Sequence, residues 1–134
     1  MRYLFLIILA MSIFYSCDKE DDFNFENERL EGLWLLTHVQ GGFSGEGYKP
    51  IFNILQINEG QQYSLMSGDA ITQEGTFVLS KEGDQFMIQF IPNVADAISF
   101  DDDSKTIIFN DEEDILILRD PCCDLYVYTF SKEE

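Results

Sequence analysis

The sequence predicts an all-β protein, an antiparallel up-and-down β-barrel of eight to nine strands. Short apolar runs are interrupted by turn residues at intervals of roughly 8–12 positions, which is typical of antiparallel sandwiches and barrels. No helical period extends beyond a turn after residue 30, and aromatic and β-branched residues, which favour strands, are plentiful. Hairpin connections favour a barrel, because closure removes the exposed edges of a sheet.

The strands follow one another with short turns between them. They are expected at Leu33–Gln40, Ile51–Asn58, Gln61–Ser67, Ile71–Ser80, Gln85–Ile91, Ala97–Phe100, Thr106–Asn110, Ile115–Arg119 and Leu125–Ser131. Gly-containing pairs such as Glu59-Gly60 and Gly68-Asp69 supply tight turns. The glycine-rich stretch Gly41–Gly47 predicts one long loop, which would edge a barrel mouth.

Alternation along each strand assigns side chains to faces, because successive residues point to opposite sides of a sheet. The expected interior comprises Ile71, Phe77, Leu79, Phe86, Ile88, Phe90, Tyr126, Tyr128 and Phe130. His38 shares a face with Trp34 and Leu36, so it is expected to point inward as well.

Two strands, Thr106–Asn110 and Ile115–Arg119, are apolar on both faces. Such strands need cover outside the barrel as well as inside. The cover can come from Phe23 and Phe25, from the segment Val94–Ala97, or from a second molecule. We expect cover from the same chain, since large bare apolar patches are uncommon on monomers.

The first residues indicate a membrane-anchored protein. Arg2 precedes an apolar run that ends at Phe14, and Ser16-Cys17 is followed at once by a charged cluster. The run is shorter than the roughly 18 apolar residues of a spanning helix, and its parts are those of a signal peptide. With a cysteine at the cleavage point, the stretch resembles a lipoprotein signal peptide of the relaxed kind found in Bacteroidota.

This resemblance implies a signal peptide over 1–16, a lipid on Cys17, an acidic tether over 17–29 and a folded domain over 30–134. The protein would then reside in the cell envelope as an outer membrane lipoprotein. The acidic run after Cys17 resembles a signal for export to the cell surface.

Acidic residues dominate the charge. Removing residues 1–16 leaves seven basic and 25 acidic residues, a formal charge of −18. Such a charge disfavours nucleic acid, whose binding relies on cations that meet phosphates, and docking on anionic lipid. The acids favour solubility and mutual repulsion, with a specific cationic partner as the alternative.

The opening Leu30-x-Gly32-x-Trp34, the element Gly75-Thr76-Phe77 and the closing Asp124-Leu125-Tyr126…Phe130-x-Lys132 resemble the small lipocalin-like lipoproteins of bacteria over residues 30–132. The resemblance implies that Trp34 closes one end of the barrel and packs under a late arginine, for which Arg119 is the candidate. Independently, Gly32 allows a tight bend, and Trp34 offers a large ring face to a cation.

Catalytic chemistry is not indicated. His38 is the only histidine and has no evident nucleophile partner, so a triad is not supported. A lone histidine on an apolar face is usually a hydrogen-bonded core residue, with a ligand contact as the alternative. Zinc spacing is absent, and no cofactor is expected. The runs Asp101–Asp103 and Asp111–Asp114 lack calcium-loop spacing and are expected to be solvated turns, with binding of a divalent ion as the alternative.

Cys122 and Cys123 follow Pro121 between the last two expected strands. Three states remain open: a strained vicinal disulfide, two reduced turn residues, and pairing with another molecule or a metal.

Two functions follow. In the first, the barrel mouth holds a small apolar or aromatic ligand, as such sites are concave and mostly apolar. Its lining would be His38, Phe77, Phe86, Phe90, Tyr126 and Tyr128. In the second, the barrel is filled by its own side chains, and another surface protein binds its outer face at Ile107–Phe109 and Ile115–Leu118 or its acidic loops. Neither function is enzymatic.

Overall fold

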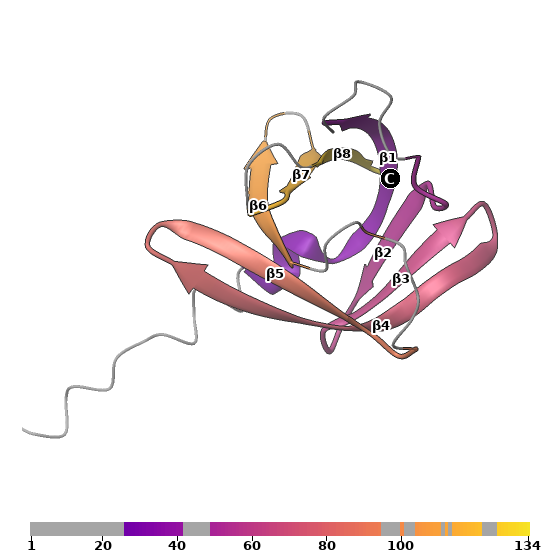
Figure 1. Ribbon diagram of the computed structural model, residues 1–134, viewed down its shortest axis with the longest axis horizontal. Coiled ribbons are helices and arrows are strands. Elements are labelled where there is room, and N and C mark those ends of the chain that lie inside the picture. The colour runs from indigo at the N-terminus through magenta and orange to yellow at the C-terminus, as the bar shows by residue number, and fades with distance from the viewer. Residues whose placement is uncertain are drawn as a thin grey trace, which may run out of the picture.

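The computed structural model describes residues 26–41, 49–94, 100, 104–110, 112, 114–121 and 126–134, which form a closed barrel (Figure 1). Its strands are β1 (Gly32–Gln40), β2 (Ile54–Asn58), β3 (Gln62–Ser67), β4 (Ala70–Glu82), β5 (Gln85–Pro92), β6 (Ser104–Asn110), β7 (Ile115–Arg119) and β8 (Val127–Lys132).

Each strand pairs antiparallel with the next along the chain, and β8 returns to pair with β1. The predicted all-β, up-and-down barrel is therefore confirmed, with eight strands in the described chain. Of the further expected strand Ala97–Phe100, only Phe100 is described, and it is not in a strand.

The two ends of the barrel differ. At the closed end lie the start of β1, the turns after β2, β4 and β6, and the end of β8. At the loop end lie the connections after β1, β3, β5 and β7. Residues 26–30 form a short helical stretch that leads directly into β1 at the closed end.

The helical stretch changes the expected boundary of the tether. Residues 26–29 were assigned to the tether, but Glu26 is only 4% exposed and pairs with Arg29 at 3.0 Å. The Arg29 guanidinium lies 4.0 Å from the ring centroid of Phe109. The ordered domain therefore includes residue 26, while the rest of the expected signal peptide and tether lies outside the described residues.

Alternation places the interior largely as predicted. On β4, the side chains of Gln73, Phe77 and Leu79 are buried while their neighbours Glu74, Thr76 and Val78 are exposed. The same period buries Ile88 and Phe90 on β5 and Tyr128 and Phe130 on β8.

Two bulges reverse the predicted orientation of individual side chains. One extra residue at Thr37 shifts the β1–β8 register, so that Leu36 pairs with buried Phe130 but His38 pairs with Thr129. His38 is therefore exposed, and its expected inward orientation is wrong. A second bulge shifts the β3–β4 register at Thr72, and Ile71, expected inside, is 57% exposed. A bulge inserts one residue and so inverts the alternation beyond it.

The strands expected to be apolar on both faces do carry apolar residues outside. Leu116 and Leu118 are fully buried, whereas Ile115 and Ile117 are half-buried and Ile108 is 36% exposed. Val94 is itself 68% exposed. Phe23, Phe25 and Ala97, the other residues considered as cover, lie outside the described residues.

Gly75 on β4 packs against the chain of β5. A Cβ at this position would overlap the backbone of Ile91 and Pro92. We expect Gly75→Ala to lower the free energy of unfolding by about 1–3 kcal/mol, since overpacking forces the backbone to move. Denaturant unfolding measures it, with the exposed neighbour Thr76→Ala as control, for which a change within about 0.5 kcal/mol is expected. Equal losses in both variants would contradict the close approach.

Candidate functional site

The barrel interior contains five aromatic side chains in mutual contact, here called the aromatic cluster. It consists of Phe52, Tyr63, Phe90, Phe100 and Tyr128, none more than 4% exposed. Phe90 and Phe100 stack with centroids 4.8 Å apart, and Tyr63 meets Phe90 edge-on at 4.8 Å. Phe100 also meets Phe52 at 5.1 Å and Tyr128 at 5.2 Å. These distances are those of packed aromatic pairs, so the cluster fills the space that it surrounds.

The residues expected to line a ligand mouth are not all part of one site. Phe90 and Tyr128 belong to the aromatic cluster, and Tyr126 lies at its margin, 6.4 Å from Tyr128. Phe77 is buried toward the closed end, where its backbone N–H donates to the Gln61 carbonyl. Phe86 is half-buried beneath the Lys81 ammonium. His38 lies outside.

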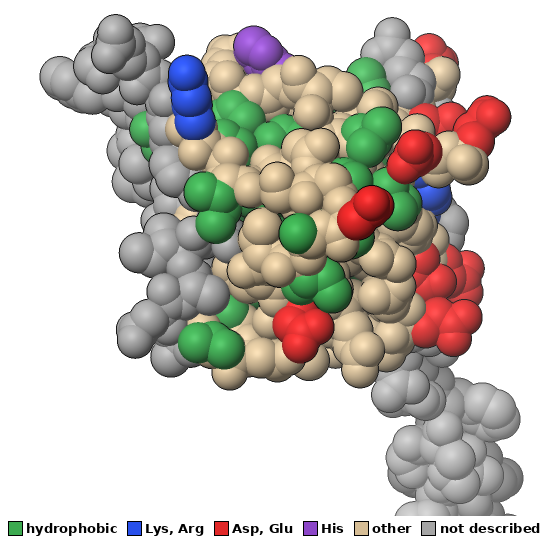
Figure 2. All heavy atoms as spheres, turned by 90° about the vertical axis from the view of Figure 1, so that its right-hand side faces the viewer, with side chains coloured by type: hydrophobic (Ala, Val, Ile, Leu, Met, Phe, Trp, Pro, Cys, Tyr) green, Lys and Arg blue, Asp and Glu red, His purple; other side chains and the backbone are tan. Residues whose placement is uncertain are grey.

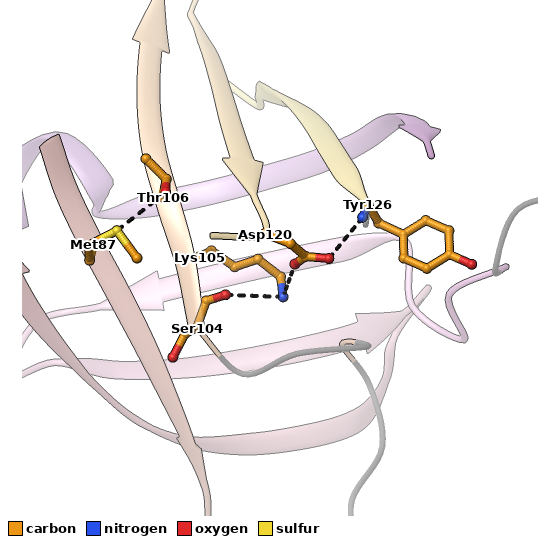
Figure 3. Close-up of polar contacts among 6 residues, drawn as sticks. All are labelled: Met87, Ser104, Lys105, Thr106, Asp120 and Tyr126. Carbon is orange, nitrogen blue, oxygen red and sulfur yellow. Dashed lines mark hydrogen bonds and ion pairs between the residues drawn. The ribbon is translucent and has the colours of Figure 1, made fainter. Parts of the chain in front are cut away.

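A buried ion pair adjoins the aromatic cluster at the loop end (Figure 3). Lys105 Nζ lies 2.5 Å from Asp120 Oδ1, and the two side chains are 0% and 1% exposed. Asp120 Oδ2 accepts a hydrogen bond from the Tyr126 N–H at 2.8 Å. The ammonium also faces the rings of Phe100 and Tyr128, at 5.2 and 5.7 Å from their centroids. The pair thus joins β6, the end of β7 and the start of β8.

Sequence reasoning missed this pair, because both residues were placed in connecting loops. Lys105 nevertheless shares its period with Ile107 and Phe109, and Asp120 continues the buried series Leu116 and Leu118. Extending the alternation by one step at each strand end would have placed both charges inside.

Trp34 closes the other end of the barrel. It is 2% exposed, and its Nε1–H donates to the Leu30 carbonyl at 2.7 Å. The Lys132 ammonium lies 5.2 Å from the ring centroid. Gly32 has a φ of +133°, and a Cβ there would come within 2.9 Å of Lys132 Cε. Gly32 therefore serves both the bend of the chain and the passage of the lysine over the tryptophan.

The expected partner of Trp34 was Arg119, and this assignment is wrong. Arg119 is exposed at the end of β7, which is at the loop end, whereas Trp34 lies at the closed end. Lys132 takes the role because β8 runs back toward the start of β1, where it pairs with Trp34 itself.

Among the described residues no three His, Cys, Asp or Glu side chains gather to hold a metal ion. Cys17, Cys122 and Cys123 lie outside the described residues, so their lipidation and redox state stay predictions. The hollows lined by described residues are open to the surface of the barrel. One hollow of about 490 Å³ lies at the closed end beside Glu28, Glu31 and Asn58.

No family model, curated protein or solved structure matches the chain. Within the described part of the chain, no helix has the length and apolar character needed to cross a membrane.

The buried pair predicts a strong effect of single substitutions. Asp120→Ala leaves the Lys105 ammonium buried without its counter-charge, and we expect the free energy of unfolding to fall by about 3–5 kcal/mol. Lys105→Met with Asp120→Asn removes both charges but keeps an acceptor for the Tyr126 N–H, so it should lose less. Denaturant unfolding of the wild type, Lys105→Met, Asp120→Asn and the double variant gives the coupling energy. Additive losses would show that the two charges do not stabilise one another.

Substitutions of Lys132 and Arg119 should differ in their effect on stability, because only Lys132 lies over Trp34. Lys132→Ala removes the cation over Trp34 and should lower the free energy of unfolding by about 0.5–1 kcal/mol. Arg119→Ala, at the opposite end, should leave it nearly unchanged. Tryptophan fluorescence of the folded protein gives a second readout, since Trp34 is the only tryptophan. A spectral change with Arg119→Ala and none with Lys132→Ala would contradict this assignment.

Proposed function

We propose that the protein is a membrane-anchored, lipocalin-like lipoprotein without enzymatic activity, whose filled barrel serves as a rigid body that binds another protein. The observation that supports this most is the aromatic cluster. A ligand in the barrel interior would have to separate Phe90 from Phe100 and Tyr63, which now pack at 4.8 Å. Small barrels are either filled by side chains or leave room for one ligand, and the described interior favours the first.

The outer wall of the barrel is the surface that we propose for binding. Of the 25 acidic residues of the chain, the eight strands contain only Glu74 and Glu82. The outward side chains of β2 to β5 are therefore nearly all uncharged, with Glu74 and Glu82 as exceptions: Ile54, Gln56, Gln62, Ser64, Met66, Ile71, Thr72, Thr76, Val78, Ser80, Met87, Gln89 and Ile91. Figure 2 shows uncharged and hydrophobic side chains over the middle of one such face, with most of the acidic ones toward one edge.

Val78 and Ile91 mark the apolar part of this wall. They are 47% and 45% exposed, and lie diagonally across the β4–β5 pair, since Ile91 pairs with Thr76. A partner with an uncharged, partly apolar face fits this wall, because contact there buries few charges and so avoids their desolvation. The acids at the barrel ends would repel an acidic partner protein, so such a partner would approach the wall instead.

The proposed anchor also suits such a role. With lipid on Cys17, eight residues separate it from Glu26, and these span at most about 28 Å when fully extended. The chain enters the barrel at the closed end, so in this proposal the tether joins the membrane to the closed end of the barrel.

Site-specific photo-crosslinking in the native cell tests the proposal. A crosslinking residue at Gln89, which pairs with Val78 on the wall, should give a discrete adduct with another protein. The same residue at Asp69, in the turn at the loop end, is the control. Val78→Lys with Ile91→Lys should lower the adduct yield about tenfold without loss of folding, since both residues are exposed.

Native mass spectrometry of the purified chain separates the two functions. A small molecule released only on denaturation, together with no adduct at Gln89, would overturn the filled-barrel proposal in favour of an interior ligand. An adduct that contains two copies of this chain would show that the wall binds a second copy rather than another protein, and would overturn that part of the proposal.

A further inference from the structure

The second half of β4 has a strand neighbour on one side only. β4 pairs with β3 as far as Thr76, and the Phe77 N–H then donates to the Gln61 carbonyl at 2.9 Å. Over Val78–Glu82, β4 pairs with β5, and no described strand lies along its other side, here called the β4 edge. Figure 1 shows this end of the β4–β5 hairpin projecting beyond the ring of the other strands.

Leu79 directs its backbone groups toward the β4 edge. Successive residues of an antiparallel strand direct their N–H and C=O groups to opposite sides, so residues two apart use the same side. Because the Phe77 N–H points toward β3, the N–H and C=O of Leu79 point the same way, past the end of β3. In the described part of the chain no group bonds to them on that side. The flanking Val78 and Ser80 are exposed, so the edge can be reached from outside.

An open strand edge is a template for another extended chain. In such strand addition, main-chain hydrogen bonds supply affinity and alternate side chains supply specificity. A helix does not fit an edge in this way, because its own N–H and C=O groups are already bonded to one another. The β4 edge therefore favours an extended segment as its occupant.

A hollow of about 490 Å³ lies where the β4 edge begins. Gln61 and Phe77, which form the last hydrogen bond before the edge, both line it, together with Asn58. A strand added along the edge would therefore run into this hollow. The helical stretch contributes two carboxylates to the lining, the exposed Glu28 and the half-buried Glu31. Both favour a cationic side chain at this end of an added strand.

We propose that the partner protein binds through an extended segment that adds to the β4 edge as a further strand, with a lysine or arginine in the hollow beside Glu28 and Glu31. The inference rests on the proposed function, because it names the part of the partner that meets the wall. Val78 and Ser80 face outward on the wall, so alternate side chains of the added strand would lie beside them. Its backbone groups would bond to Leu79.

The blocked peptide acetyl-Lys-Val-Thr-Val-Thr-Val-amide tests the edge directly, because it has one cation and residues that favour extended structure. Added to the purified, ¹⁵N-labelled full chain, it should shift the amide signals of Val78, Leu79 and Ser80 and slow hydrogen exchange at Leu79. The same peptide with methylated backbone nitrogens cannot donate hydrogen bonds, and its Kd should be about tenfold higher. Equal binding of the two peptides, or shifts confined to other strands, would overturn the proposal.

The role of charge is tested by a change on each side of the contact. The peptide with glutamate in place of lysine should bind about tenfold more weakly. Glu28→Gln with Glu31→Gln should abolish this difference between the peptides and keep the fold, since neither residue is buried. Asp69→Asn, in a turn at the loop end, is the control and should leave the difference unchanged. A difference that persists without Glu28 and Glu31 would refute the cationic contact in the hollow.

The strand addition and the proposed function fail separately. Binding of the peptide at Leu79 without an adduct at Gln89 in the cell would overturn the proposed function and support the open edge. An adduct at Gln89 with no binding of the peptide would overturn the strand addition and leave the wall as the binding surface.

Discussion

The ion pair between Lys105 and Asp120 is the interaction on which the loop end of the barrel depends. It connects three consecutive strands, since Lys105 lies on β6, Asp120 ends β7 and the Tyr126 N–H precedes β8. Two charges at 0% and 1% exposure are tolerated only when they are paired and hydrogen-bonded. The pair therefore fixes the geometry in which Phe100 and Tyr128 pack beside the ammonium. Any opening of this end toward the interior must separate the two charges or move the rings that enclose them.

The two ends are thus closed by different chemistry. At the closed end, cations lie over aromatic rings: Lys132 over Trp34 and Arg29 over Phe109. Both cations come from the extremities of the domain, so the helical stretch before β1 and the last strand are fastened to the same end. At the loop end the charges are internal and the aromatic cluster covers them. In a barrel closed in this way the aromatic cluster is buried, whereas side chains such as Val78 and Ile91 on the wall are exposed.

Periodicity in the sequence predicted the sheet but not its irregularities. Alternation placed Phe77, Phe90, Tyr128 and Phe130 inside, because a filled barrel requires apolar residues on every second position. It failed at His38 and Ile71, since each lies beyond a bulge, and nothing in the local composition at Thr37 or Thr72 marks an extra residue. The alternation also missed Lys105 and Asp120. Each lies one residue outside an expected strand, and a charge at a strand end is usual for a loop residue. Lys132 was part of the closing motif, yet pairing it with Trp34 required knowledge of which strands meet.

The distribution of acids links these features. Carboxylates are concentrated in the turns and termini, and Glu74 is the only one within the span of a strand rather than at its end. The Glu74 backbone carbonyl accepts a hydrogen bond from the Asn93 N–H at 2.9 Å and so holds the chain after β5 in place. The one carboxylate within the span of these strands therefore lies beside the bulge at which Ile71 turns outward. Charge and exposed apolar surface thus meet at the bulged start of β4, whereas the outward side chains in the middle of β4 and β5 are uncharged.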